Sequence, residues 1–263
     1  MKKGFITATL LLTTQFIHAQ AVTPCKDMFP DTCMRATRPH WFSGWQGFAL
    51  TGAAYAGLGY LTYKHWDDDI KNFFQRNRSG FSNRFSKSAG SLGLGKVQAI
   101  GWLGTTAAAF LTKNQRLKQM VFIWAGALLI NNVATDQLKK TFQRHRPNTD
   151  DGPYRFDWRG GSRTNLSFPS AHTSNIFTTA TVFATTYCNK KWVSAVAYGV
   201  AAVVGISRIH DNAHWASDVM AGAAIGFLSA KSSALLYKLT SRKLHFLPFY
   251  SRTVAGVAMT IQL

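Results

Sequence analysis

Six apolar segments, each rich in small residues, dominate this chain and restrict the folds open to it. They lie at Trp45–Tyr63, Val97–Leu111, Met120–Val133, Asn175–Tyr187, Val193–Ile206 and Val219–Leu236. Ala, Gly, Ser and Thr recur in all of them, and such residues let helix backbones approach closely. Strand patterns are few before the last twenty residues. We therefore predict an all-α fold, a bundle of about six helices.

The N-terminus has the pattern of a secretory signal. Two lysines are followed by the mostly apolar stretch Phe5–Ile17, and small residues come next at Ala19 and Ala21. This order of basic, apolar and small residues is typical of a cleaved signal peptide. We expect residues 1–21 to be a signal peptide or a retained anchor helix. Either alternative places the rest of the chain across or beyond the inner membrane of a bacterium-like cell, in the cell envelope.

The C-terminal tail has a strand pattern instead of a helical one. Val257–Leu263 alternates apolar residues with small or polar residues, and Phe246–Tyr250 precedes it across a turn. We expect these two segments to pair as a short β-hairpin. The predicted organisation is thus one helical domain over 22–243 and a tail or hairpin over 244–263.

Segment length leaves membrane insertion undecided. A membrane-spanning helix needs about 20 apolar residues, whereas apolar runs of 10–14 are typical of buried core helices. Met120–Val133 and Val193–Ile206 are apolar but short, and the mean hydropathy of the chain is only −0.06. An integral membrane protein and a soluble or peripheral protein both remain hypotheses.

The charge of the chain points to anionic partners. Thirty Lys and Arg residues face eleven Asp and Glu residues, for a net charge of +19. This charge favours an anionic membrane surface or a phosphorylated substrate. We expect no nucleic-acid partner, because no nucleic-acid-binding motif accompanies the charge.

The segment Lys64–Lys96 is basic and polar, with phenylalanines interleaved. It begins near Asp67-Asp68-Asp69, and acidic residues favour the first turn of a helix. The segment is either a solvated helix and loop across one end of the bundle or an interfacial segment that lies on anionic lipid.

Three cysteines are compatible with an oxidising compartment. Cys25 and Cys33 are near neighbours and either form a local disulfide or stay reduced, whereas Cys188 has no cysteine near it and is expected at a helix end. No group of Cys or His residues has the spacing of a zinc site, so we expect no structural metal.

The residues that carry chemistry fall in three blocks. In the last block, His214 and Asp218 are four residues apart, and on a helix they share one face. A carboxylate in that position accepts a hydrogen bond from one imidazole nitrogen and leaves the other free to attack an electrophile. Arg208 precedes His214 by six residues and is expected to reach the same pocket. A surface pair or a helix cap would give the same pattern.

The middle block is Pro169-Ser170-Ala171-His172. Ser170 is suited to cap a helix that begins near Ala171. The first amide groups of such a helix, together with its dipole, favour a bound phosphate, and His172 lies beside them in the first turn. An ordinary capped helix start would look the same.

The first block is Lys139, six intervening residues and Arg146-Pro147. Proline disfavours helix at the preceding residue, so the chain is expected to bend at Arg146. Lys139 at the helix end and Arg146 in the turn are expected to converge on one anion. The alternative is a basic helix terminus, because Lys140, Arg144 and His145 crowd the same place.

Together these blocks resemble the three-part motif of the type 2 phosphatidic acid phosphatase (PAP2) superfamily, which includes bacterial acid phosphatases and vanadium haloperoxidases. The motif is Lys-x6-Arg-Pro, then Pro-Ser-Gly-His, then Ser-Arg-x5-His-x3-Asp. The order and spacing match over Lys139–Asp218, about a third of the chain, and Ala171 is the one departure, where the family usually has Gly. The position needs only a backbone N–H, which Ala supplies unless a positive φ is required.

The resemblance implies a role for each matching residue. His214 would attack phosphorus and form a phosphohistidine, Asp218 would orient it, and His172 would protonate the leaving oxygen and then activate water. The phosphate oxygens would be held by cations and by the helix start, namely Lys139, Arg146, Arg208, Ser170 and the Ala171 N–H. Such chemistry requires no metal and no cofactor. His210 and His145 are expected to be structural.

We expect hydrolysis of a phosphomonoester or pyrophosphate of a membrane lipid at the periplasmic face. The alternatives are a soluble periplasmic acid phosphatase acting on small phosphoesters, a lipid phosphotransferase, a vanadium haloperoxidase and a non-catalytic lipid-binding protein. The loop Asn148–Ser167, between two blocks of the motif, is expected to rim the site and is suited to gate it. Oligomeric state has no signal in the sequence.

Overall fold

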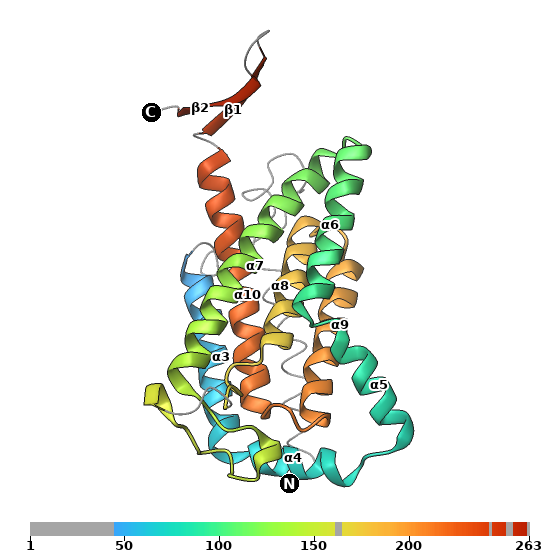
Figure 1. Ribbon diagram of the computed structural model, residues 1–263, viewed down its shortest axis with the longest axis vertical. Coiled ribbons are helices and arrows are strands. Elements are labelled where there is room, and N and C mark those ends of the chain that lie inside the picture. The colour runs from blue at the N-terminus through green and yellow to red at the C-terminus, as the bar shows by residue number, and fades with distance from the viewer. Residues whose placement is uncertain (1–44, 161–164, 242–243, 251–254, 262–263) are drawn as a thin grey trace.

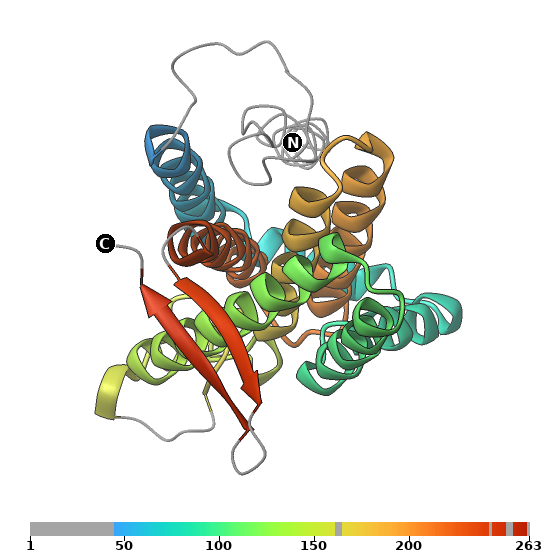
Figure 2. The same cartoon turned by 90° about the horizontal axis from the view of Figure 1, so that it is seen from above.

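Eight α-helices form a bundle in the described part of the chain (Figures 1 and 2). A computed structural model describes residues 45–160, 165–241, 244–250 and 255–261. The helices are α3 (Trp45–His65), α4 (Asp67–Arg76), α5 (Gly80–Ser91), α6 (Gly95–Leu111), α7 (Gln115–Phe142), α8 (Ala171–Thr186), α9 (Lys191–His210) and α10 (Ala216–Ser241). Two short 3₁₀ helices, η2 (Pro147–Thr149) and η3 (Trp158–Gly160), lie between α7 and α8.

The all-α prediction is confirmed, and each predicted apolar segment lies in one of the long helices, apart from Tyr187, which follows the last residue of α8. The segment Lys64–Lys96 supplies α4 and α5, and α4 begins at Asp67 as the three aspartates indicate. The tail forms the expected hairpin: β1 (Leu244–Tyr250) pairs antiparallel with β2 (Ala255–Ile261), with Phe246 opposite Met259.

Two expectations about the N-terminal part lie outside the described residues, namely the signal segment 1–21 and the Cys25–Cys33 bond. Cys188 is the second residue after the end of α8, so its predicted place at a helix end is confirmed. It is disulfide-bonded although no other cysteine lies near it in the sequence.

Helix α8 is the central element and packs against α7, α9 and α10. Its sequence is rich in Thr and Ser, and most of these side chains are buried. Their hydroxyls donate to carbonyls one turn earlier, as Thr178 does to Ser174 at 2.8 Å and Thr181 does to Phe177 at 2.8 Å. Burial of these hydroxyls is therefore compensated by hydrogen bonds within the helix.

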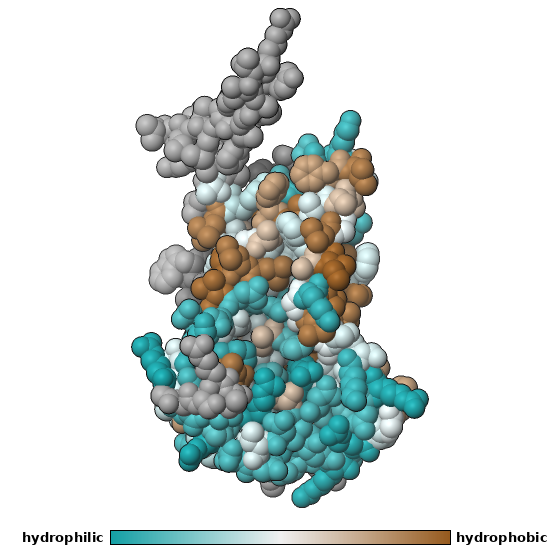
Figure 3. All heavy atoms as spheres, viewed as in Figure 1, coloured by the Kyte–Doolittle hydropathy of each residue, from teal (hydrophilic) through white to brown (hydrophobic). Residues whose placement is uncertain are grey.

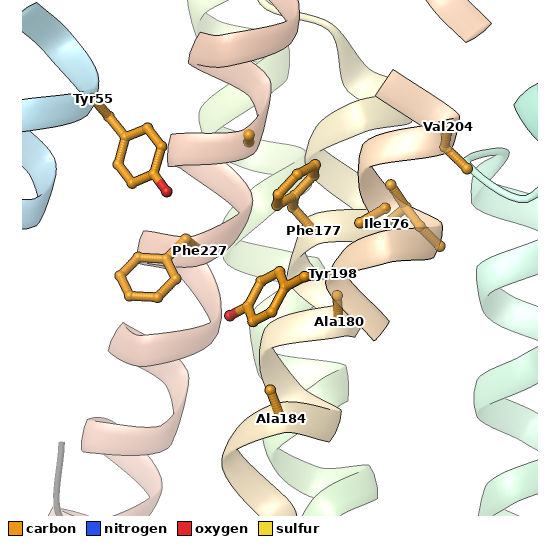
Figure 4. Packing of buried hydrophobic residues seen from close by; sticks show 10 residues of the cluster. Tyr55, Ile176, Phe177, Ala180, Ala184, Tyr198, Val204 and Phe227 are labelled. Carbon is orange, nitrogen blue, oxygen red and sulfur yellow. The ribbon is translucent and has the colours of Figure 1, made fainter. Parts of the chain in front are cut away.

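The core around α8 is built from aromatic and small residues. Phe177, Tyr198 and Phe227 pack with Tyr55 from α3, and Ala180 and Ala184 fill the spaces between the helices (Figure 4). A second cluster surrounds Trp124, whose ring contacts Phe183 edge-on at 5.5 Å between ring centroids. These clusters fix α8 against its neighbours and thereby fix the position of its N-terminus.

Glycines on α10 set the closest approach to α8. A Cβ atom on Gly222 would lie 2.5 Å from the carbonyl oxygen of Ser170, and one on Gly226 would lie 2.3 Å from that of Ser174. Real Cβ atoms do not approach backbone so closely. The start of α8 is therefore in close contact with the second and third turns of α10, which helps to bring the middle and last motif blocks together.

Apolar side chains also cover much of the outer surface of the bundle. Figure 3 shows a broad hydrophobic region on the shaft of the bundle and a hydrophilic end over α4, α5 and the loop before α8. Among the described residues, three helices are long and apolar enough to cross a membrane: Gln115–Phe142, Lys191–His210 and Ala216–Lys238. Exposed apolar residues on the long helices include Ile100, Leu103, Phe122, Leu129, Trp192, Val196, Leu235 and Leu236. Such a large exposed apolar surface is expected of a membrane protein rather than of a soluble monomer.

Candidate active site

The three motif blocks meet at the hydrophilic end of the bundle. Lys139 is in the last turn of α7, Arg208 is in the last turn of α9, and α8 begins at the same end (Figure 1). The Ser170 amide donates to the Asp218 carbonyl at 3.1 Å, and Lys139 Nζ donates to the Leu166 carbonyl at 2.5 Å. Segments more than 25 residues apart in sequence therefore form one polar site.

Arg146 lies in the bend that its proline predicts. Its backbone is extended, with φ −82° and ψ 156°, and η2 follows directly with Pro147 as its first residue. Helix α7 ends before this bend at Phe142, where Gln143 takes the left-handed conformation with φ 46°. This left-handed residue stops the helix and turns the following residues back toward α8 and α10.

The start of α8 is suited to hold an anion. The helix begins at Ala171, as predicted, and Ser170 occupies the N-cap position. The Ser170 side chain makes no capping bond, however, and its Oγ accepts from Thr173 Oγ1 at 2.9 Å. Ala171 is absent from the residues with positive φ, so a side chain fits there without backbone strain. The first amide groups of an α-helix have no partner within the helix, so those of α8 are suited to bind an anion.

His214 is held in one tautomer by a backbone carbonyl. Its Nδ1 lies 2.8 Å from the Ser167 oxygen, which only accepts, so Nδ1 carries the proton and Nε2 keeps its lone pair. Asp218 Oδ2 is 3.8 Å from Nδ1, beyond hydrogen-bond range. The expected direct bond to Asp218 is thus replaced by one to Ser167, because His214 precedes α10 instead of lying on its first turn. Burial lowers the pKa of His214 to about 4.

Asp218 organises the backbone around His214. Its Oδ2 accepts from Ser167 Oγ at 2.5 Å and from the Trp215 amide at 3.0 Å, and its Oδ1 accepts from Arg144 at 2.6 Å. The carboxylate is fully buried. It therefore fixes both Ser167, which binds His214, and the turn that carries His214.

His172 lies among the cations expected to bind phosphate. Burial, together with the nearby charges of Arg208, Lys139 and Arg146, lowers its pKa to about 4. These three cations thus come close to one imidazole, as the motif predicts. Arg208 donates to Asp211 at 3.1 Å, while its buried Nε has no partner among the described residues. An unpaired buried N–H is costly, and an anion in the site would satisfy it.

The two other histidines have structural contacts. His210 Nε2 lies 3.0 Å from Ser82 Oγ and joins α9 to α5. His145 lies between Asp151 and Asp157, with its Nδ1 at 2.6 Å from the former and its Nε2 at 3.0 Å from the latter. These carboxylates raise the pKa of His145 above its usual value although burial opposes them.

The loop between α7 and α8 is attached to its surroundings at several points. Lys71 of α4 pairs with Asp150 at 2.9 Å, and Tyr154 Oη donates to the Lys64 carbonyl at 2.9 Å. The His145 contacts hold the same loop from within. The described part of Asn148–Ser167 therefore rims the site in a fixed position, and its suggested gating role remains a prediction.

Two charged residues of this site were missed by the sequence reasoning. Arg144 was interpreted as part of a basic helix terminus, yet it is buried between Asp67 and Asp218. Asp67 was expected only to begin a helix, yet its side chain reaches Ser217 in α10. Sequence spacing gives no signal for either contact, because Asp67 lies 150 residues from its partner.

Comparisons with known proteins agree with this geometry. A sequence model of the PAP2 superfamily matches residues 117–242, which include every residue of the three blocks. The chain is 26% identical over 236 residues to a lipid A 1-phosphatase from Porphyromonas gingivalis, an alignment that covers 86% of this chain and 49% of that protein. It is 30% identical over 129 residues to a lipid A 4'-phosphatase from the same organism, covering 45% of this chain and 52% of the relative. The chain thus spans about half the length of the curated relatives it matches.

Solved structures share the fold. Aquifex aeolicus LpxE superposes with a TM-score of 0.51 at 25% identity, covering 64% of this chain and 93% of that one. A transmembrane PAP2-type phosphatidylglycerolphosphate phosphatase from Bacillus subtilis superposes with a TM-score of 0.53 at 22% identity, covering 74% and 94% of the two chains. The second likeness concerns the fold alone.

Proposed function

Because this chain belongs to the PAP2 superfamily, we propose that it is a phosphatase that removes phosphate from a membrane lipid through a phosphohistidine. The observation that carries this proposal is the environment of His214. Its Nε2 is unprotonated and lies in a site with three cations and a helix N-terminus. That arrangement combines a nucleophile with the charge stabilisation that phosphoryl transfer requires.

The reaction proceeds in two displacements. His214 Nε2 attacks phosphorus, the bond from phosphorus to the lipid oxygen breaks, and His172 gives that oxygen its proton. A water molecule then loses a proton to His172 and attacks phosphorus, the phosphorus–nitrogen bond breaks, and phosphate leaves. Lys139, Arg146 and Arg208 stabilise the equatorial oxygens in both steps.

His172 must carry a proton when the first step begins. Burial and three cations disfavour that proton, since they lower the pKa of His172 to about 4. A bound phosphate dianion neutralises those cations and raises the pKa of His172 again. Substrate binding therefore prepares the acid that the reaction needs.

We propose a phosphorylated glycolipid of the lipid A type as the first substrate to test. Support comes from the names of the matched relatives, which act on lipid A at its 1- or 4'-phosphate. Phosphatidic acid, phosphatidylglycerol phosphate and undecaprenyl pyrophosphate present the same terminal phosphate group to the site and belong in the same panel.

The proposed location is the inner membrane of the cell envelope, with the site at the periplasmic face. Support comes from the three long apolar helices and from the placement of the site at the hydrophilic end of the bundle (Figure 3). Residues 76–91, which include α5, contain four basic and no acidic residues, and Phe81 and Phe85 are exposed there. Such a segment is suited to contact an anionic membrane surface beside the site.

The test is a phosphate-release panel with purified protein in mixed micelles. Lipid A, the other lipid phosphates and a small chromogenic phosphoester are compared at equal surface concentration, with His214→Gln as the control for contaminating phosphatases. We expect the highest kcat/KM on a lipid. A higher kcat/KM for the small ester, together with recovery of the protein in the periplasmic fraction after osmotic shock, would indicate a soluble acid phosphatase instead.

The intermediate needs its own measurement. Rapid acid-free quenching during turnover of ³²P-labelled substrate should trap label on the wild-type protein, and this label should be stable to base and labile to acid. The His214→Gln protein should carry none. Label found on a hydroxyl or carboxylate residue would contradict a histidine nucleophile.

A further inference from the structure

Arg144 is a buried cation whose hydrogen-bonding capacity is fully used within the protein. Its side chain is 1% exposed. It donates five hydrogen bonds. Two go to the Pro153 carbonyl, from Nε at 3.0 Å and from one terminal nitrogen at 2.8 Å. The other three go to Ser217 Oγ at 2.7 Å, to Asp218 at 2.6 Å and to Asp67 at 2.8 Å. An arginine has five N–H donors, so none is left for a substrate. Arg144 therefore differs from the cations that face the phosphate.

Three aromatic rings complete the surroundings of this guanidinium. Its central carbon lies 5.1 Å from the ring centroid of Tyr63, 5.4 Å from that of Phe156 and 5.5 Å from that of Trp215. Rings at this distance attract the cation and exclude water. The Arg144 charge therefore acts on its two carboxylate partners with little screening.

Asp67 is the partner that the three-block motif does not contain. It is 2% exposed and lies at the start of α4. Besides Arg144, it accepts from the Ser217 amide at 2.9 Å and from Ser217 Oγ at 2.5 Å. Asp67 thus joins α4 to the first turn of α10, directly beside Asp218.

A continuous chain of contacts leads from this pair to the nucleophile. Asp67 binds Arg144, Arg144 binds Asp218, Asp218 accepts from Ser167, and the Ser167 carbonyl accepts from His214 Nδ1. Every group in this chain is buried. Displacing Arg144 therefore disturbs the atom that fixes the tautomer and orientation of His214.

We propose that Arg144 and Asp67 are a positioning pair that holds Asp218 and, through Ser167, aims His214 Nε2 at the phosphorus. Two carboxylates around one guanidinium leave a net charge of −1 in the network. That charge stabilises the cationic imidazole ring that forms when Nε2 binds phosphorus while Nδ1 keeps its proton. The predicted effect of this pair on catalysis rests on the proposed phosphatase function, whereas its effect on the orientation of His214 does not.

Removal of Arg144 has a consequence that a merely structural residue would not produce. Asp67 and Asp218 would remain close together in a dry site without their cation, and one of them would take up a proton near neutral pH. We expect Arg144→Gln to lower kcat about 100-fold or more and to change KM less than threefold. In a plot of kcat against pH, the fall of kcat on the acid side, here called the acid limb, should move to higher pH. Arg144→Lys should recover part of kcat, because lysine restores the charge but has only three donors.

Charge balance provides the decisive variant. In the double variant Arg144→Gln with Asp67→Asn, the network again carries −1, so the acid limb should return toward that of the wild type. Lys140→Gln is the matched control, because Lys140 is an exposed cation on α7 whose ion pair in the described part of the chain is with Asp136. A phosphate-binding role for Arg144 would instead raise KM and leave the acid limb in place. An unmoved acid limb in a folded Arg144→Gln protein would overturn the proposal.

Orientation of His214 is measured separately, by ¹⁵N NMR of histidine-labelled protein in micelles. The His214 signal, identified by its loss in His214→Gln, should show a single Nδ1–H tautomer in the wild type and a mixture in Arg144→Gln. The milder Ser217→Ala, which removes one contact from each member of the pair, should shift the same signal if Arg144→Gln fails to fold. If the variants keep the single Nδ1–H tautomer of the wild type, the positioning role is overturned, whether or not the wild type hydrolyses a substrate. If the wild type is inactive but the tautomer changes in the variants, only the proposed function is overturned.

Discussion

The Nδ1 atom of His214 lies 2.8 Å from the carbonyl oxygen of Ser167. This contact determines the chemistry available to the imidazole, because a carbonyl accepts a hydrogen bond and cannot donate one. Nδ1 is therefore the protonated nitrogen, and Nε2 is the one free to attack. Since burial lowers the pKa of His214 to about 4, the ring is neutral at neutral pH and is ready to react before substrate arrives.

Replacement of His214 by Gln should abolish phosphate release. Glutamine has nearly the size of histidine and retains hydrogen bonding, but it cannot form a phosphorylated intermediate. We expect kcat to fall by about 10³-fold or more. The measurement is phosphate release from the best lipid of the panel, with Lys140→Gln as a folded control expected within twofold of the wild type. Substantial turnover by the Gln variant would contradict the assigned nucleophile.

The pH dependence should reflect opposite requirements of the two histidines. His214 must be neutral to attack, so activity falls at low pH as it gains a proton. His172 must be protonated to assist departure of the lipid oxygen, so activity falls at high pH as it loses one. Both pKa values are lowered to about 4, and the negative charge of a bound phosphate should raise them. We expect a bell-shaped kcat profile with its optimum below pH 6.5, measured in buffers of constant ionic strength. An optimum above pH 8 would contradict these roles.

Leaving-group chemistry isolates the role of His172. A lipid alkoxide needs a proton as it departs, whereas a nitrophenolate is stable without one. We expect His172→Asn to lower kcat on a lipid phosphate about 10³-fold. On a nitrophenyl phosphate, the rate of the phosphorylation step should fall much less, so nitrophenolate should be released in a burst before the slow steady state. The burst arises because the second step still needs His172 to activate water. Equal losses on both substrates, without a burst, would show that His172 binds phosphate and does not transfer a proton.

Hydrophobic patterning predicted the helices well, because the apolar segments have enough length and small-residue content to specify their own secondary structure. Val193–Ile206, for example, lies within α9. The residues at which the helices end were harder to predict from this pattern. Helix α7 continues to Phe142, nine residues beyond the apolar run that ends at Val133, because its last turns are amphipathic and end at a left-handed Gln143.

Site residues that belong to a motif with fixed spacing could be predicted from the sequence, whereas residues brought to the site only by tertiary contacts could not. His172, His214 and the three cations follow from residue order along the chain. Asp67 and Arg144 do not, since an aspartate at a helix start and an arginine in a basic run usually face solvent. Their burial depends on α4 packing beside the start of α10, and no local pattern encodes that contact.

The unusual alanine of the middle block should be compatible with full activity. Ala171 does not have a positive φ, so its methyl group causes no backbone strain. We expect Ala171→Gly to keep kcat/KM within about twofold and to lower the free energy of unfolding by up to about 1 kcal/mol, because glycine is more flexible in the unfolded chain. Steady-state kinetics and thermal unfolding check both expectations. A large gain in kcat on the change to Gly would show that the methyl group hinders the substrate.

Gly93, in contrast, should resist any side chain. It lies in the turn between α5 and α6, and a Cβ atom there would be 2.7 Å from the His172 carbonyl oxygen and 2.8 Å from the His172 Cβ. His172 is held at the start of α8 by the core around that helix, so the added methyl group must displace either the turn or the imidazole. We expect Gly93→Ala to lower kcat about tenfold or more and to lower the unfolding temperature. Gly104→Ala is the matched control, because Gly104 is in helix α6 and the added Cβ would meet no other described element within 4 Å. Alanine there should keep kcat within twofold and stabilise the helix slightly. Equal effects of the two substitutions on kcat would contradict a direct contact between this turn and His172.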